Sequence, residues 1–331
     1  MTPSSPSSSQ QQSSFFAGID VAKDKLDLAT SDNDSVRTFD NTDAGHRAIV
    51  KLLVDRKPAC IVIESTGGYE WSLVQALLEA NLNVARVNPG DVRHVALGLK
   101  RLAKTDAIDA RTLVRFAQIA EPRLLEKCTA NQAELAALVT CRRQLQNTLT
   151  QQSNRLAMTR SPRAVKAIRQ VSVTIQKQLD ALDAAIRKLI DSDDHFKDID
   201  RLLRSVPGIG PVASATLASQ MPELGKTDRR QAPALLGVVP YNHDSGQLSG
   251  TRSIYGGRVE PRNVIYMATL SAIKHNPVIR AFADRLREKK KKGKVIIVAC
   301  MRKLITILNA MLRDRLEWNQ LTLVKNLALN P

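Results

Sequence analysis

Short apolar segments alternate with amphipathic ones through the first third of the chain. β-branched and other apolar residues are concentrated at 15–29, 35–39, 59–64 and 83–87, which predicts strands, with a hairpin turn at 31–34. Apolar residues at helical spacing predict helices over 44–54 and 70–80. Because strands and helices alternate from residue 15 to about residue 119, we expect an α/β sheet domain.

The pattern changes between Asn131 and Leu189, where glycine is absent and apolar residues recur at heptad spacing. Ser161 and Pro162 separate two such stretches. The spacing predicts an antiparallel helical hairpin or a coiled coil that joins subunits, and ordinary amphipathic bundle helices fit it equally well. The repeating positions are Leu135, Leu138, Leu145, Leu149 and Leu156, then Val165, Ile168, Ile175, Leu179, Leu182, Ile186 and Leu189.

The segment from Leu203 to Leu217 combines an apolar helix end, a Pro-Gly-Ile-Gly turn and a stretch of small residues. This pattern predicts a helix-hairpin-helix element, and a plain corner between two helices is the alternative. In the first case Gly208 and Gly210 would let the backbone approach a phosphate near the N–H groups of the next helix. A Gly/Ser-rich loop at 241–257 and apolar helices at 264–273 and 295–312 follow.

Positive charge dominates the composition. The chain has 49 Lys and Arg residues against 32 Asp and Glu, a net charge of +17, which indicates a polyanionic partner. Aromatic residues make up only 4%, so stacking on an aromatic platform is not expected to be the main binding mode. One basic run is predicted to contact a DNA or RNA backbone, although such runs are usually solvated loops; it consists of Lys289, Lys290, Lys291, Lys292 and Lys294.

Cysteine spacing and hydropathy bear on the compartment. Cys60, Cys128, Cys141 and Cys300 lack C-x-x-C spacing, so we expect neither a zinc site nor a disulfide framework, and a reduced, cytoplasmic location. No apolar run is expected to reach the roughly 20 residues that span a bilayer. Residues 1–14 form a Ser/Gln-rich segment that we interpret as a disordered tail and not as a signal peptide.

Four acidic residues stand out against this basic background. Asp20 lies near the end of the first apolar run, and Glu64 ends a later one, where Ser65 and the residues after it stop the strand. Asp106 and Asp109 are three residues apart in a helical stretch, which places both on one helix face. Clustered carboxylates without His or Cys favour Mg²⁺ over Zn²⁺.

Each of these acids alone is weak evidence, because a strand-end Asp is usually a turn former and an Asp pair usually a solvated helix face. Their joint order is more specific: an acid on a first strand, an acid on a later buried strand, and an acid pair on a helix. That order predicts the RNase H-like (RuvC-like) nuclease layout, in which strands deliver carboxylates to one end of a central sheet.

The motifs in their order resemble the DEDD transposases of bacterial insertion sequences, the insertion-sequence family numbered 110 with its related group. The resemblance covers nearly the whole chain after residue 14. It rests on Gly18-Ile19-Asp20-Val21-Ala22-Lys23, Glu64-Ser65-Thr66-Gly67, Asn88-Pro89, Lys104-Thr105-Asp106-Ala107-Ile108-Asp109-Ala110, Pro207-Gly208-Ile209-Gly210, Asp244-Ser245-Gly246, Arg262 and the Lys-Lys-Gly-Lys-Val stretch at 291–295.

The resemblance implies a site-specific DNA recombinase guided by a structured bridge RNA. It implies an RuvC-like domain at 15–128, a coiled-coil segment at 129–200 and a mainly α-helical transposase domain with the helix-hairpin-helix at 201–325. By this resemblance Asp20, Glu64, Asp106 and Asp109 bind two Mg²⁺ ions, and Ser245 is the nucleophile. The partners would be the DNA of the element ends and of the target, the bridge RNA, and further copies of the chain in a dimer of dimers.

Three other classes share parts of this pattern. A junction resolvase or ribonuclease would have the same tetrad but hydrolyse with water, without Ser245. An ATPase of the actin and sugar-kinase superfamily also starts with a Gly-Ile-Asp strand, yet a second Gly-rich phosphate loop is absent from the sequence and the net charge of +17 is wrong for a small-molecule kinase. A non-catalytic nucleic-acid binder would explain the charge but not the acids.

Overall fold

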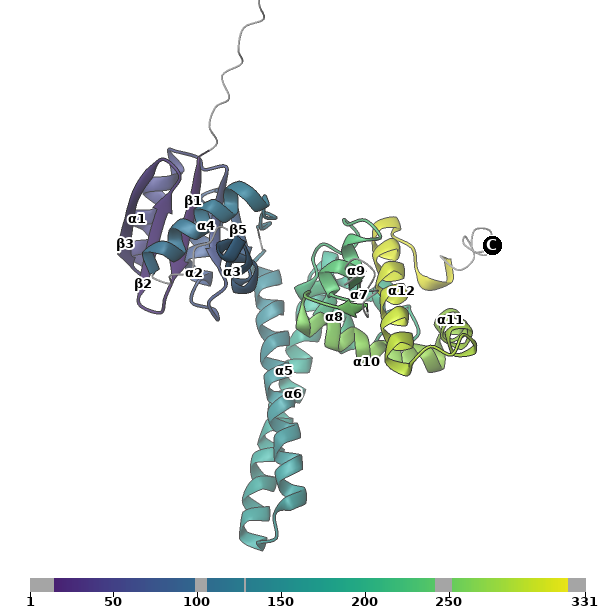
Figure 1. Ribbon diagram of the computed structural model, residues 1–331. Coiled ribbons are helices and arrows are strands. Elements are labelled where there is room, and N and C mark those ends of the chain that lie inside the picture. The colour runs from purple at the N-terminus through teal and green to yellow at the C-terminus, as the bar shows by residue number, and fades with distance from the viewer. Residues whose placement is uncertain (1–14, 99–105, 128, 242–251, 321–331) are drawn as a thin grey trace, which may run out of the picture. The chain divides into compact units, whose positions relative to one another are not determined.

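The computed structural model describes residues 15–98, 106–127, 129–241 and 252–320. The chain divides into two compact units, Met1–Cys128 and Thr129–Pro331, which are described separately (Figure 1). The Ser/Gln-rich tail, the 99–105 segment and the 242–251 segment with Ser245 lie outside the described residues.

The first unit is built on one mixed sheet. Its strands are β1 (Phe16–Val21), β2 (Lys25–Thr30), β3 (Asn33–Asp40), β4 (Cys60–Glu64) and β5 (Val84–Val87), in the order β3-β2-β1-β4-β5. The first three strands are antiparallel, whereas β1, β4 and β5 are parallel. The helices are α1 (Asp43–Val54), α2 (Trp71–Glu79), α3 (Pro89–Gly98) and α4 (Asp106–Ala120). The expected α/β sheet domain is confirmed.

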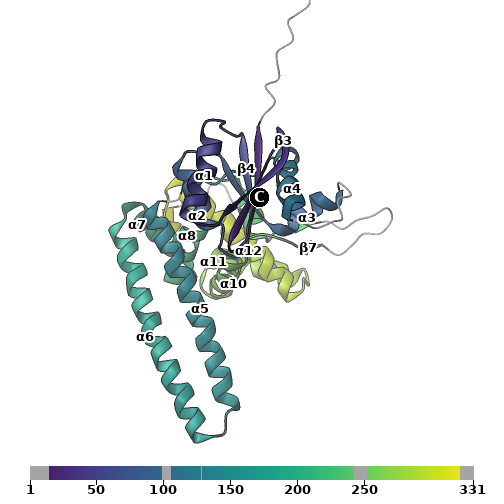
Figure 2. The same ribbon diagram turned by 90° about the vertical axis from the view of Figure 1, so that its left-hand side faces the viewer.

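Alternation along the strands sends side chains to two separate cores. Ile19 and Ile61 join α1 and α2 in one buried cluster. Cys60 and Val62 join α3 and α4 in another, on the opposite face. Helices therefore cover both faces of the sheet, as a sheet with parallel central strands requires (Figures 1 and 2).

One expectation for this unit was wrong. The apolar run 15–29 is two antiparallel strands, because the polar residues Lys23 and Asp24 form a tight turn closed by the Ala22 N–H, which donates to Lys25 O at 2.9 Å. The predicted strand over 83–87 is confirmed as β5, and Asn88-Pro89-Gly90, which follows it, also begins helix α3. Proline suits the first helical position, and Asn88 Oδ1 accepts from the Gly90 N–H at 2.8 Å.

The second unit is mainly helical. Its helices are α5 (Ala130–Met158), α6 (Pro162–Ser192), α7 (Asp194–Arg204), α8 (Pro211–Gln220), α9 (Gln231–Leu236), α10 (Val259–His275), α11 (Pro277–Glu288) and α12 (Gly293–Asp314). The short strands β6 (Pro240–Tyr241) and β7 (Ser253–Ile254) pair antiparallel.

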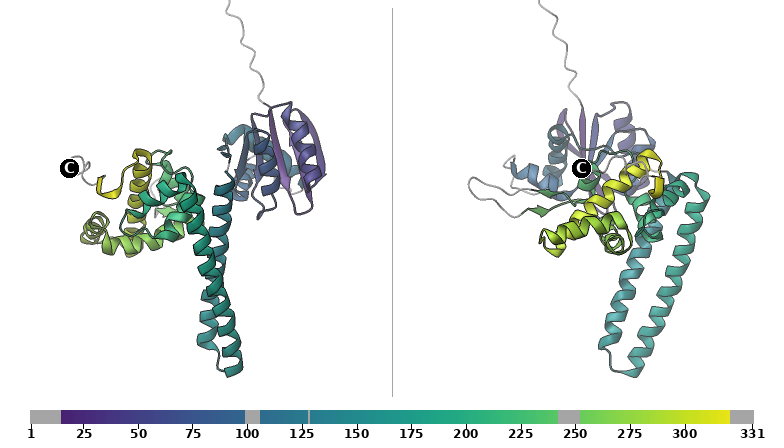
Figure 3. Two further views of the ribbon diagram at one scale, coloured as in Figure 1. Left: turned by 180° about the vertical axis from the view of Figure 1, so that it is seen from behind. Right: turned by 90° about the vertical axis from the view of Figure 1, so that its right-hand side faces the viewer.

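Helices α5 and α6 lie side by side along their length (Figures 2 and 3). Buried Ile186 and Ile190 of α6 share a cluster with Leu135 and Val139 of α5. Arg142 also reaches across, with Nε 2.5 Å from Asp183 Oδ1. Of the arrangements that the heptad spacing predicted, the structure shows the antiparallel helical hairpin. A coiled coil that joins subunits stays a prediction.

Helix α12 packs against α7, α9, α10 and α11 in the second unit. Among the described helices it alone is long and apolar enough to cross a membrane, so the expectation that no apolar run has this length was wrong. Its side chains Leu304, Ile305 and Leu308 are fully buried in the main cluster together with Ile265 of α10. Burial within the protein therefore accounts for its apolar character.

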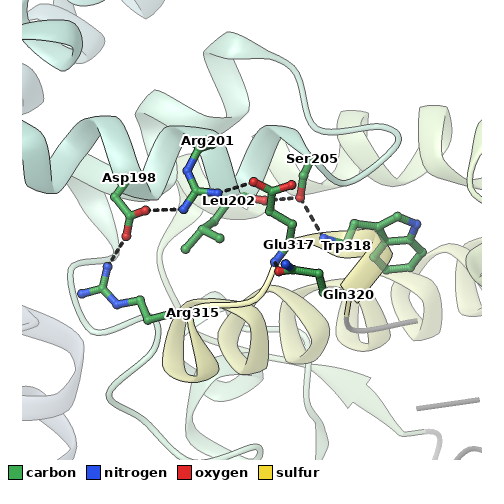
Figure 4. A network of polar contacts seen from close by, with 8 residues as sticks. All are labelled: Asp198, Arg201, Leu202, Ser205, Arg315, Glu317, Trp318 and Gln320. Atoms are coloured by element: carbon green, nitrogen blue, oxygen red, sulfur yellow. Dashed lines mark hydrogen bonds and ion pairs between the residues drawn. The ribbon is translucent and has the colours of Figure 1, made fainter. Parts of the chain in front are cut away.

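The segment after α12 is held against α7 by ion pairs (Figure 4). Asp198 lies 2.6 Å from Arg201 Nη2 and 2.5 Å from Arg315 Nη1, and these hydrogen bonds and charges keep its pKa low. The Trp318 N–H donates to Ser205 Oγ at 3.0 Å. Trp318 is thereby fixed with its side chain in the core of this unit, only 6% exposed.

Candidate active site

Asp20 and Glu64 lie at the same edge of the first unit's sheet. In the parallel pair of β1 and β4 the register runs from Phe16 opposite Cys60 to Ile19 opposite Ile63. The two acids directly follow that last pair, one on each strand. Adjacent parallel strands thus deliver two carboxylates to one end of the sheet, the arrangement that the order of acids in the sequence predicted.

Gly18 lets α4 pack tightly against β1. A Cβ atom at Gly18 would lie 2.5 Å from Ala110 O and 2.7 Å from Leu113 Cβ. Asp20, two residues further along the strand, is on this same face. Asp109 precedes the fully buried Ala110, so the first turns of α4 are held beside β1.

The direction of α4 places its N-terminal turn at the edge that carries Asp20 and Glu64. After α4 the chain returns to the opposite edge, where the Leu125 N–H donates to Val84 O at the start of β5. The helix begins at Asp106, whose side chain lies outside the described part. The backbone therefore brings the beginning of α4 toward the two strand acids.

The donor set suits a hard divalent cation, because it contains only carboxylates. Within the described part of the chain, which leaves out the side chain of Asp106, no three His, Cys, Asp or Glu side chains form a group that could hold a metal ion. The partial burial of Asp20, Glu64 and Asp109 leaves each of them accessible at this edge.

Asp27 is a further acid on this face that the sequence analysis did not single out. It lies in β2 directly opposite Asp20 and is only 5% exposed. The Thr38 hydroxyl donates to its Oδ1 at 2.5 Å, and Lys25 Nζ is 3.3 Å from its Oδ2. The alternation of apolar and polar residues in β2 could have revealed it. Leu26 and Leu28 flank Asp27 and pack in the core on the other face, so Asp27 must lie on the face of Asp20.

Glu70 organises the loop that follows Glu64, which the sequence analysis also did not predict. Its carboxylate is fully buried and accepts from the Gly68 N–H at 2.9 Å and the Thr66 N–H at 3.3 Å. Arg86 Nε donates to its other oxygen at 2.9 Å. Burial alone raises the pKa of Glu70, but these backbone hydrogen bonds and the charge of Arg86 hold it below its ordinary value.

Asn41 ties this loop to the end of β1. Its Nδ2 donates to Ala22 O at 3.0 Å and to Tyr69 O at 3.2 Å. Its Oδ1 is 2.8 Å from Nε2 of His46, whose pKa is lowered by burial. Three segments at the carboxyl edge of the sheet are therefore joined through one amide side chain.

In the second unit, the ends of the segment that contains Ser245 are anchored by glycines. A Cβ atom at Gly257 would lie 2.2 Å from the Gly237 backbone nitrogen, so the chain crosses itself closely just outside β6 and β7. Arg262 donates to Gly256 O at this crossing. The neighbouring Arg258 binds Glu223 with both terminal nitrogens, at 2.7 and 2.5 Å.

Two family models match these two parts of the chain. One, described as Transposase, covers residues 17–159, and the other, described as Transposase IS116/IS110/IS902 family, covers residues 200–284. The chain belongs to the IS110 family of transposases. As a member of this family, the transposase is a DNA-cleaving and rejoining enzyme, and the two matched ranges contain Asp20, Glu64, Asp106, Asp109 and Ser245.

The similarity to curated relatives covers nearly the whole chain of the transposase. Pilin gene-inverting proteins of Moraxella bovis and Moraxella lacunata are each 28% identical over 318 residues, which cover 91% of this chain and 97% of theirs. Among solved structures, RuvC of T. thermophilus with a Holliday junction substrate is 14% identical and covers 34% of this chain and 99% of that one, with a TM-score of 0.27.

The transposase uses Gly208 for packing. A Cβ atom there would lie 2.8 Å from the Ala272 backbone nitrogen, so this glycine lets the turn before α8 approach α10. Its φ of 108° also favours glycine. Gly210 has open space around it and precedes the first residue of α8. Of the two glycines, Gly210 is the one that leaves room for a phosphate.

Positive charge is concentrated in two exposed places in the second unit. The lysines of the basic run are all exposed; four of them lie between α11 and α12, and Lys294 lies in the first turn of α12. The other place is the distal part of the α5–α6 hairpin, since residues 135–179 contain no Asp or Glu. Within the described ranges, six exposed basic residues there have no ion-pair partner: Arg155, Arg160, Arg163, Lys166, Arg169 and Lys177.

Proposed function

We propose that this transposase is a site-specific recombinase that cuts and rejoins element and target DNA by a serine mechanism at a divalent-metal site. The observation that carries the proposal is the convergence of Asp20, Glu64 and the start of α4 at one sheet edge. The names of the Moraxella relatives, which are gene-inverting proteins, support it, because inverting a DNA segment requires every broken end to be rejoined.

In this proposal Asp20, Glu64, Asp106 and Asp109 hold two Mg²⁺ ions. Such ions supply positive charge that assists phosphoryl transfer. The β1–β4 register and the packing at Gly18 fix three of the four acids on rigid elements, which favours precise positioning of a phosphate. Asp27, which is nearly buried and lies opposite Asp20 on the neighbouring strand, adds a further negative charge next to it.

Ser245 is proposed to attack the scissile phosphorus through its Oγ. The Ser Oγ–P bond forms as one P–O bond of the DNA backbone breaks, and the hydroxyl proton passes to the released sugar oxygen. Because one phosphodiester replaces another, the reverse step can rejoin a strand without ATP. Gly237, Gly257 and Arg262 would serve this step by anchoring both ends of the serine segment.

The guide and the assembly are part of the proposal. A structured bridge RNA would pair with donor and target DNA, and the acid-free hairpin and the basic run offer cationic surface for RNA and DNA. A dimer of dimers would bring the acid site of one copy to Ser245 of another. Purified transposase should then carry RNA, and recombination should depend on the transcript that flanks its gene.

The self-association test must avoid the interior of the hairpin. Ile175 is buried between α5 and α6, so charge at Ile175 and Leu182 would damage the hairpin itself. Val171 and Val173 are exposed on α6. Replacing both by Glu is expected to reduce oligomers in light scattering with unchanged helicity, and an unchanged oligomer would exclude this surface as the contact.

The deciding experiment traps the covalent intermediate. Wild-type protein with DNA, Mg²⁺ and the flanking transcript is expected to give a protein–DNA adduct that survives denaturation and maps to the Ser245 peptide. Ser245→Ala should lose the adduct but keep DNA binding, whereas Asp20→Asn and Glu64→Gln should lose both cleavage and metal binding. An adduct elsewhere would exclude Ser245 as the nucleophile, and DNA cleavage by Ser245→Ala without any adduct would favour the water-hydrolysing resolvase.

A further inference from the structure

Two large aromatic side chains are exposed in the segment that follows the strand acid Glu64. Tyr69 is 52% exposed and Trp71 is 46% exposed, although the chain as a whole is only 4% aromatic. Both belong to the segment that leads from Glu64 at the end of β4 into α2. An exposed Trp is a costly surface feature, and it is informative when the ring is also held in a fixed orientation.

The Trp71 ring is held from one side by a charged residue. The Arg86 guanidinium lies over it, 4.7 Å from the ring centroid, and donates at the same time to the buried Glu70. The cation is thereby fixed between a carboxylate and an indole. Arg86 covers one part of the ring, and 46% of the Trp71 residue remains exposed.

The loop does not offer its backbone to a phosphate. The Thr66 and Gly68 N–H groups, which could form an anion-binding nest, already donate to the Glu70 carboxylate. The adjacent Gly67 and Gly68 have φ of 75° and 115°, backbone conformations that glycine adopts without the steric cost of a side chain. What this loop presents outward is therefore aromatic surface.

The aromatic pair lies at the same sheet edge as the acids. Asn41 bonds both Ala22 O and Tyr69 O, so the backbone of Tyr69 is next to the chain just beyond Asp20. Ser65, immediately after Glu64, also donates its N–H to Val87 O at 3.0 Å, which aligns the loop with the end of β5. By strand alternation Asp20 and Glu64 lie on the sheet face that α4 covers, whereas α2 packs on the other face, so a nucleic-acid strand would contact both the acids and the rings by crossing this edge.

We propose that Trp71 and Tyr69 form a stacking platform for an unpaired nucleobase next to the phosphate that is cut. The proposal rests on the proposed function, because it takes a nucleic acid as the ligand of this edge. Paired bases keep their faces inside the duplex, whereas an unpaired base can place its ring against an aromatic side chain. Arg86 acts as a positioning residue that orients the Trp71 ring.

Tryptophan fluorescence tests the contact directly, because the chain has only two tryptophans and Trp318 is buried in the other unit. In full-length Trp318→Phe the remaining Trp71 signal should be quenched by single-stranded DNA or single-stranded RNA oligonucleotides, and little by blunt duplex DNA. Trp71→Phe, which reports from Trp318 alone, should show no quenching. Should Trp318→Phe fold poorly, the difference between wild type and Trp71→Phe gives the same signal.

Binding measured by anisotropy of a labelled oligonucleotide supplies the second readout. Trp71→Leu is expected to weaken single-strand binding by about five- to a hundredfold, with an unchanged salt slope because no charge is altered. Trp71→Phe, which keeps a ring, should retain most of the affinity. The DNA and RNA arms then identify which strand the platform prefers.

The outcomes separate this proposal from the proposed function. Binding by anisotropy without Trp71 quenching, or equal affinity of Trp71→Leu and wild type, would overturn the platform and leave the recombinase intact. Equal quenching by duplex and single strands would overturn the preference for an unpaired base. Failure of every oligonucleotide to bind would overturn both proposals.

Discussion

Asp27 in β2 lies directly opposite Asp20 in β1, on the face of the sheet that α4 covers. Facing positions on antiparallel strands have Cβ atoms about 4.5–5.5 Å apart, and like charges there repel. Lys25, which is 3.3 Å from Asp27, offsets part of this charge. We therefore expect the pair of acids to raise the affinity of this edge for cations and the lysine to lower it.

Substitutions of Asp27 and Lys25 are expected to change metal binding in opposite directions. Asp27→Asn keeps the shape of the side chain but removes its charge, so Mg²⁺ or Mn²⁺ affinity should fall by about tenfold or more. Lys25→Gln should strengthen it. Isothermal calorimetry on the folded variants measures both, and an unchanged affinity in Asp27→Asn would show that Asp27 is only structural.

Gly18→Ala is expected to disturb the acid site through α4. The added Cβ would lie 2.5 Å from Ala110 O, and overpacking of this kind costs about 1–3 kcal/mol. Because α4 must shift, DNA cleavage should fall under conditions in which the variant remains folded. Urea unfolding and a cleavage assay measure the two effects.

Gly98→Ala is the matched control for this change. Gly98 is also a glycine of the first unit, but a Cβ there meets nothing within 4 Å. It lies at the end of α3, where alanine favours the helix. Stability and cleavage are expected to stay near wild type, and equal losses in both variants would contradict the role given to Gly18.

Glu70 is expected to make stability depend on pH. Its pKa in the folded protein is below the ordinary 4.5, so its contribution is complete above that value and is lost as pH falls through the lower folded pKa. Glu70→Gln should cost about 2–3 kcal/mol near neutral pH, because the charge-assisted hydrogen bonds of the carboxylate are removed. Denaturant unfolding should show the gap to wild type closing below about pH 4.5, and a constant gap would contradict it.

The distal hairpin is expected to contribute to the salt dependence of nucleic-acid binding. Replacing Arg160, Arg163, Lys166 and Arg169 by Gln should reduce the slope of log K against log salt by about 0.9 for each duplex phosphate that these side chains neutralise in the wild type. The control replaces Arg187 and Lys188 at the base of α6, where Arg187 pairs with Asp200 at 3.5 Å. Equal slopes in the two variants would exclude a special role for the distal part.

Local sequence patterns predicted most of the elements but not the contacts between them. Glu64 was identified because an apolar run ends at it, and β4 does end there. Asp27 was not, because the run 15–29 was interpreted as one strand. Only the antiparallel pairing of β1 with β2, which the turn at Lys23 and Asp24 produces, places Asp27 opposite Asp20.

Long-range contacts explain the remaining differences. The sequence shows Glu70 as one more acid at the start of a helix, and its burial depends on Arg86 from a strand 16 residues away. The motif around Gly208 suggested a phosphate contact. In the structure, the space that a side chain at Gly208 would need is occupied by Ala272 of α10. Ser245, which the family resemblance supplied, could not have been selected from a Ser-Gly dipeptide in a loop.

The crossing of Gly237 and Gly257 has a consequence for engineering. The crossing is made by backbone atoms of residues outside β6 and β7, so it does not depend on the side chains of the segment between these two strands. Because Ser245 lies between Tyr241 and Ser253, variants that keep the serine but change the residues around it are expected to keep the crossing of Gly237 and Gly257. Variation in this one insert offers a way to alter substrate range on an otherwise unchanged scaffold.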